Sequence, residues 1–213
     1  MDDYKDEIIA RLNKSKIYQI LKNRCEDRDS EVIALVDNVT IYSYNRTKTI
    51  VRHMGEFTLH DGEHLFRVLN IMELLLSSDV IEFLSIPELQ LLMMSAFMHD
   101  IGMAPDEKDV LAWKKIWDLE PEFESAEEKA VFEDFKRFYS ARPDDQKRIN
   151  SYIRQGKHSK ADTIKSYLIT EFIRQTHAER AREIIERDWD NKIKFRDVDL
   201  TVEFAQICFS HNE

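Results

Sequence analysis

The stretch Glu88–Asp100 (ELQLLMMSAFMHD) predicts a helix that is apolar on nearly every side. A helix that is hydrophobic all round is buried inside a protein. The preceding Ser85-Ile86-Pro87-Glu88 has the order of a helix start, with a capping serine, a proline near the first turn and a glutamate three residues after the serine. Gly102 and Pro105 follow as stop signals. We therefore expect a central buried helix that ends at His99-Asp100.

Helical patterns cover most of the remaining chain, and turn residues are scarce. The 213 residues include 4 glycines and 4 prolines, whereas a β-sandwich or barrel needs turn residues about every 8–12 positions. The Gly-rich phosphate-binding motifs G-x-G-x-x-G and G-x-x-x-x-G-K-[ST] are absent. An all-α protein is predicted. Its expected helices lie at 4–22, at 30–53 with Ser30 as N-cap, after the capping signal Thr58–Asp61, at 161–187 and at 200–211, with a polar turn at 188–199.

The charge and the cysteine content exclude several classes of protein. The net charge of −10 and the pI of about 5.3 argue against an extended nucleic-acid surface, which needs clustered cations. Cys25 and Cys208 have no metal-like or disulfide-like spacing, so we expect reduced thiols. The start MDDYKDEIIA is acidic where a secretory signal is basic, and no apolar run approaches the ~18 residues of a membrane span. We expect a soluble cytoplasmic protein with no membrane partner.

Residues 106–158 differ from the apolar segments around them. The part from 118 to 145 has 10 acidic and 4 basic residues, and the part from 146 to 170 has 6 basic residues and one acidic residue. Such polar, charge-segregated stretches are typical of surface helices. We expect residues 106–158 to be a helical insert between core helices.

The histidines provide the candidate chemistry. His60 and His64 are four residues apart and therefore share one face of a helix. His99-Asp100 ends the apolar helix, where a buried carboxylate needs a compensating cation or hydrogen bonds, and a divalent metal is one such cation. His177 and His211 each lie on an expected helix. Taken singly, these residues also fit a helix cap or a satisfied core histidine.

Taken together, they resemble a known pattern. His60-Asp61-Gly62-Glu63-His64-Leu65-Phe66-Arg67-Val68 followed by Met98-His99-Asp100-Ile101-Gly102 is similar to the HD superfamily of metal-dependent phosphohydrolases. The spacing from His60 to His64 resembles the cyclic-nucleotide phosphodiesterase branch. His177 and His211 resemble the additional histidine ligands of two-metal branches such as HD-GYP, although the GYP triplet is absent, which weakens cyclic di-GMP as a substrate. The resemblance covers about residues 55–105 and 170–213.

The resemblance implies an HD-domain helical bundle and a role for each candidate residue. His64, His99 and Asp100 would bind a first divalent metal, with Asp100 bridging to a second held by His177 and His211. His60 would be the general acid, and Arg180 would stabilise phosphoryl oxygens or else form a surface salt bridge. Mn²⁺, Fe²⁺, Zn²⁺, Ni²⁺ or Mg²⁺ would suit these ligands. Water activated by the metal would attack a nucleotide or phosphodiester substrate.

The expected organisation has N-terminal helices at 1–54 packing on an HD domain at 55–213, with the insert at about 106–158. The superfamily's last aspartate ligand is expected after His211, so we expect a chain truncated at its C-terminus or catalytically weakened. The alternative function is a degenerate HD module that binds metal or ligand and regulates a fused or partner domain, such as an ATPase. The sequence leaves the substrate, the metal and the oligomeric state open.

Overall fold

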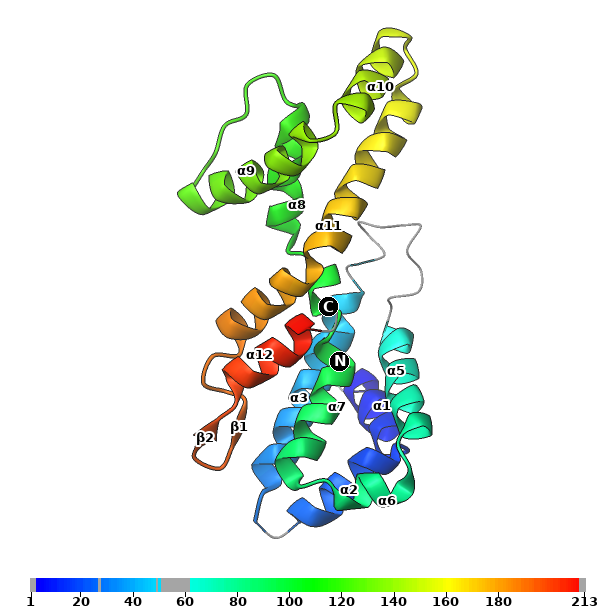
Figure 1. Ribbon diagram of the computed structural model, residues 1–213, viewed down its shortest axis with the longest axis vertical. Helices are drawn as coiled ribbons and strands as arrows, with labels where there is room; N and C mark the ends of the chain where they lie inside the picture. The colour runs from blue at the N-terminus through cyan, green and yellow to red at the C-terminus, as the bar shows by residue number, and fades with distance from the viewer. Residues whose placement is uncertain (1–2, 27, 49, 51–61, 211–213) are drawn as a thin grey trace.

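A computed structural model describes residues 3–26, 28–48, 50 and 62–210, and most of these residues are helical. One long helix, α11 (His158–Asp188), extends along the molecule, and shorter helices pack on each of its halves (Figure 1). The two strands have two residues each. The predicted all-α class is therefore confirmed. No helix in the described part of the chain is long and apolar enough to cross a membrane.

The first hydrophobic cluster, here named the N-terminal core, joins the first helices to the end of the chain. Its elements are α1 (Asp3–Leu12), α2 (Lys16–Cys25), α3 (Ser30–Thr47), α5 (Gly62–Leu75), α6 (Ser78–Phe83), α7 (Ile86–Met98), the second half of α11 and α12 (Thr201–Ser210). Helix α7 lies at its centre, and Leu89, Met93 and Phe97 are fully buried. The predicted central buried helix is confirmed.

Helix α7 also begins where the sequence predicts. The backbone N–H of Ser85 donates to Glu88 Oε2 at 2.7 Å, which is one half of a capping box, and a proline stands in the first turn. The helix ends at Met98 with His99 as its C-cap. The start of α7 thus depends on local side-chain chemistry. His99 and Asp100 lie directly after its other end, beside the core.

Two of the expected helix boundaries were wrong. The range 4–22 is divided into α1 and α2, because Ser15 caps α2 by accepting a hydrogen bond from the Tyr18 backbone N–H at 3.1 Å. The Ser15 hydroxyl also donates to Glu73 Oε1 on α5 at 2.6 Å, a tertiary contact that holds the break in place. Helix α3 has Asp29 as its N-cap, and Ser30 is its first helical residue.

The second hydrophobic cluster, here named the insert core, lies on the first half of α11. Its helices are α8 (Glu107–Lys114), α9 (Ala126–Ser140), α10 (Pro143–Arg154) and the 3₁₀ turn η2 (Lys115–Trp117). Aromatic rings dominate it: Phe135 packs edge-on against Trp117 and Phe172 with ring centroids 5.8 and 5.2 Å apart. The buried side chains of residues 107–154 therefore share this second core with the first half of α11 and with Ile50, Met103 and Ala104. The helices α8, α9 and α10 lie beside that half of α11 (Figure 1).

The segment after α11 is more ordered than the expected polar turn at 188–199. Strands β1 (Lys194–Phe195) and β2 (Val198–Asp199) pair antiparallel. Arg196 has a φ of 54° in the tight turn that joins them, and it donates from Nε to Asp29 Oδ1 at 3.1 Å. This ion pair ties the hairpin to the start of α3. Helix α12 then packs back against α11 (Figure 1).

Candidate metal centre

Three helical elements bring histidines to the buried Asp100. Asp100 lies between the end of α7 and the short 3₁₀ helix η1 (Ile101–Met103). Its Oδ2 atom is 3.1 Å from Nε2 of the neighbouring His99 and 3.4 Å from Nε2 of His64 on α5. Its Oδ1 atom is 3.6 Å from Nε2 of His177 on α11. One carboxylate is therefore surrounded by imidazoles from three different helices.

The donor atoms are close enough to share one ion. His64, His99 and Asp100 each offer a ligand atom, and these atoms lie within 4.8 Å of one another. The His64 and His99 side chains are 23% and 19% exposed, so the cluster is open to solvent on one side. Two imidazoles and one carboxylate form a ligand set that suits Mn²⁺, Fe²⁺, Zn²⁺ or Ni²⁺. The cluster can hold a divalent metal.

The tautomer of His177 supports this fit. Its Nδ1 lies 2.6 Å from the Arg174 carbonyl oxygen, which can only accept a hydrogen bond, so Nδ1 carries the proton. In the neutral ring Nε2 then presents a lone pair towards Asp100 Oδ1. Two acceptor atoms that face each other at 3.6 Å are well arranged for a cation between or beside them. A backbone carbonyl that orients a metal-binding histidine in this way is common in metal sites.

Two glycines lie at close approaches between helical elements, one beside the centre and one within it. A Cβ atom on Gly62, at the start of α5, would lie 2.3 Å from the Tyr44 ring. A Cβ atom on Gly102, in η1, would lie 1.9 Å from the His177 carbonyl oxygen and 2.7 Å from the Ala181 nitrogen. A side chain at residue 62 would require the Tyr44 ring to shift, whereas the contact at Gly102 is with backbone atoms and cannot accommodate a larger residue. The backbone after Asp100 therefore rests directly on the helix that carries His177.

The structure brings four of the expected site residues together. His64, His99, Asp100 and His177 meet, as the resemblance to HD domains implies. His60 and His211 lie outside the described residues. The expected general acid and the last expected ligand of the second metal therefore stay predictions.

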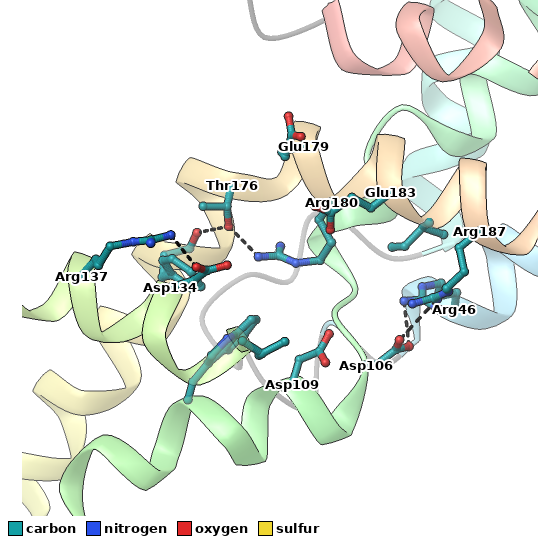
Figure 2. Close-up of a pocket in the computed structure, with 14 residues that line it drawn as sticks. Arg46, Asp106, Asp109, Asp134, Arg137, Thr176, Glu179, Arg180, Glu183 and Arg187 are labelled. Atoms are coloured by element: carbon teal, nitrogen blue, oxygen red, sulfur yellow. Dashed lines mark hydrogen bonds and ion pairs between the residues drawn. The ribbon is translucent and has the colours of Figure 1, made fainter. Parts of the chain in front are cut away.

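Arg180, one turn after His177, lines a cavity and makes two hydrogen bonds. Its Nη1 donates to the Gly102 carbonyl at 2.8 Å. Its Nη2 donates to Thr176 Oγ1 at 2.5 Å (Figure 2). The guanidinium carbon lies 5.2 Å from the centre of the Trp113 ring. Burial lowers the pKa of Arg180 to about 10, so the side chain stays charged at neutral pH. Its expected contact with phosphoryl oxygens stays a prediction.

A cavity of about 370 Å³ adjoins Arg180 and lies between α11, α8 and α9 (Figure 2). Ion pairs occupy much of its wall: Asp106 is 2.9 Å from Arg46 and 3.4 Å from Arg187, and Asp134 is 2.5 Å from Arg137. Sequence reasoning did not find this cavity. Its lining comes from separate elements, and no spacing along the chain indicates that they meet.

The fold and the ligand cluster define a class of protein: an HD domain, in which helices present histidines and an aspartate to one metal centre. The sequence matches the HD-CE family over residues 54–213, about three quarters of the chain. This chain therefore belongs to the HD-CE family. Neither the comparison with curated proteins nor the comparison with solved structures found a match.

Proposed function

We propose that this chain is a metal-dependent phosphohydrolase that acts on a nucleotide or another phosphodiester. The observation that carries the proposal is the convergence of His64, His99 and Asp100, with ligand atoms within 4.8 Å of one another, in a chain of an HD-domain family. His177 adds a fourth donor 3.6 Å from Asp100. Imidazole and carboxylate donors at one half-open point suit hydrolysis better than simple structural metal binding, which uses closed sites.

Each residue of the centre has a proposed role. His64, His99 and Asp100 would hold a first divalent ion, and Asp100 would also face a second ion bound through His177. A divalent ion in such a site would lower the pKa of bound water to about 7 and would offset phosphate charge. The hydrogen bond from His177 Nδ1 to the Arg174 carbonyl keeps Nε2 directed at the centre. His60 would protonate the leaving oxygen, and His211 would complete the second metal site.

The charge of the chain favours a small substrate. A net charge of −10 repels long phosphate polymers, whereas a single phosphodiester can be neutralised locally by metal. Two cations of the basic stretch form short-range pairs, Lys147 with Asp144 at 3.1 Å and Arg148 with Asp145 at 3.2 Å. We therefore propose a mononucleotide, a dinucleotide or a comparable small ester as the substrate.

The test is hydrolysis of bis(p-nitrophenyl) phosphate and of a nucleotide panel, with Mn²⁺, Mg²⁺, Zn²⁺ and Ni²⁺ supplied in turn. The variants His64→Ala and Asp100→Ala should lose turnover with every metal. The matched control is His158→Ala, because His158 is an exposed histidine at the start of the same helix that carries His177. Its turnover should equal that of the wild type.

The outcomes separate the two functions considered for the chain. Metal-dependent hydrolysis that Asp100→Ala abolishes supports the phosphohydrolase. Stoichiometric metal uptake with no hydrolysis of any substrate in the panel contradicts it, and favours a module that binds metal and regulates another domain. Hydrolysis that survives Asp100→Ala would place the activity elsewhere or in a contaminant.

A further inference from the structure

We propose that Arg180 is a positioning residue of the metal centre, which holds Asp100 in place through the Gly102 carbonyl. This inference rests on the proposed function, because it concerns how the same metal centre is held. Arg180 does not contact Asp100 through any hydrogen bond in the described structure; its Nη1 donates at 2.8 Å to the carbonyl oxygen of Gly102, two residues further along the chain. The short segment from Asp100 to Gly102 connects the two groups.

Helix η1 transmits this contact to Asp100. The backbone N–H of Met103 donates to the Asp100 carbonyl at 2.9 Å, and that of Ala104 donates to the Ile101 carbonyl at 3.2 Å. Ile101, Gly102 and Met103 are all buried. A tight turn of this kind moves as one unit, so a displacement of Gly102 also displaces the carboxylate of Asp100.

Gly102 is held from two sides. Its Cα faces the backbone of α11, where a Cβ atom would lie 1.9 Å from the His177 carbonyl. Its carbonyl is bound by Arg180, which lies on the same helix. Close packing keeps η1 from moving towards α11, and the Arg180 hydrogen bond keeps it from moving away. Both contacts come from α11, so this one helix fixes the distance between Asp100 and its own residue His177.

The Arg180 guanidinium is itself held in a defined direction. Thr176 Oγ1 accepts from Nη2 at 2.5 Å while its own hydroxyl donates to the Phe172 carbonyl at 2.6 Å. The ring of Trp113 lies on another side, 5.2 Å away. Burial disfavours the charged form of Arg180 and lowers its pKa. Burying a charged group costs free energy unless hydrogen bonds or opposite charges compensate for it. The hydrogen bond from the charged guanidinium to the Gly102 carbonyl provides part of this compensation, and such a bond is stronger than one between neutral groups.

The first experiment measures Mn²⁺ binding by calorimetry in the full chain. Arg180→Met keeps much of the side-chain length but removes the donors, and it should weaken Mn²⁺ binding by about 10–100-fold, as loss of an outer partner of a metal site does. Arg180→Lys should recover part of this loss, since one ammonium can reach the Gly102 carbonyl but cannot also hold Thr176 in the same planar geometry. Arg137→Met is the control, because Arg137 lines the same cavity and pairs with Asp134.

A double-mutant cycle adds a readout that a general loss of stability would not produce. Thr176→Val removes the acceptor that orients Arg180 and should weaken Mn²⁺ binding by a smaller factor than Arg180→Met. In the double variant the two effects should not add, because they act through one hydrogen-bonded unit. Additive losses, or equal losses in Arg137→Met, would overturn the proposal.

Amide hydrogen exchange tests the same idea in the absence of metal. In Arg180→Met the amides of Met103 and Ala104 should exchange about five- to tenfold faster, as expected for the loss of one supporting hydrogen bond. Unchanged exchange there would overturn the positioning role. A wild-type chain that takes up no Mn²⁺ would contradict the proposed function, and the exchange result would then decide the role of Arg180 alone.

Discussion

Gly102 packs against His177 so closely that a Cβ atom on residue 102 would lie 1.9 Å from the His177 carbonyl oxygen. The contact joins the turn after Asp100 to the helix that carries a candidate ligand. It lets the Asp100 and His177 side chains meet at 3.6 Å, although they belong to distant parts of the chain. The absence of a side chain at residue 102 is therefore a condition for the geometry of the centre.

Gly102→Ala should destabilise the protein by about 3 kcal/mol or more, because the added methyl group meets backbone atoms that cannot rotate away. Urea denaturation measures the change. Gly156→Ala is the comparison, since residue 156 has a φ of 69° and open space around it, so that backbone strain alone should cost about 1–2 kcal/mol. Equal effects of the two substitutions would contradict the close contact at Gly102.

Asp100→Asn should abolish stabilisation by metal while it leaves the shape of the site nearly intact. With Mn²⁺ at about 100 times its dissociation constant, the wild type should gain about 2.7 kcal/mol over its stability in EDTA. The variant should gain almost nothing, because it loses the anionic ligand. Asp162→Asn, at an exposed aspartate of α11, is the control and should respond to Mn²⁺ as the wild type does. Thermal melting with and without metal measures both.

Ser85→Ala should destabilise the protein by about 1 kcal/mol through the loss of the α7 cap. The cap also predicts a pH dependence. Hydrogen bonds from Ser85 lower the pKa of Glu88, so the contribution of this carboxylate to stability is present above its ordinary pKa of 4.5 and is lost as the pH falls through the lowered value. Glu88→Gln should flatten this part of the profile of unfolding free energy against pH. An unchanged acid limb in that variant would refute the assignment.

Cys208 should remain a thiol far into the alkaline range. Burial on α12 raises its pKa from 9.0 to about 12. Because the folded state holds the proton more tightly than the unfolded state, the contribution to stability is complete below about pH 9 and is lost as the pH rises towards about 12. The unfolding free energy of the wild type should thus fall more steeply between pH 9 and 11 than that of Cys208→Ser. Parallel profiles for the two proteins would argue against a buried thiol.

The sequence predicts the fold class and the main helices well, and it misses boundaries that depend on distant residues. Helix α7 and its cap are local features, so a pattern of apolar residues and a Ser-Glu pair suffices to predict them. The break between α1 and α2 depends in part on the hydrogen bond from Ser15 to Glu73, which belongs to another helix. The hairpin at 194–199 likewise depends on the pairing of Arg196 with Asp29. Local periodicity cannot indicate such partners.

For the candidate site, the resemblance to HD domains names His64, His99, Asp100 and His177, which the residue types taken singly do not. The close packing of Gly102 against α11 was not predicted. A glycine after a helix indicates the end of that helix, whether or not another helix lies against it. The direction of Arg180 was not predicted either. Its position one turn after His177 is compatible with a side chain that points to the histidines or with one that points to the cavity.

By itself, then, the sequence determined that the protein is helical, which helix is buried, and which imidazoles and carboxylate are available for metal. Only the tertiary structure decided that these groups meet around Asp100, that Arg180 binds the Gly102 carbonyl, and that a cavity lies between α11 and the insert helices. The physical reason is that helical periodicity decides which residues share one face of a helix. The distance between residues on different helices depends on how those helices pack.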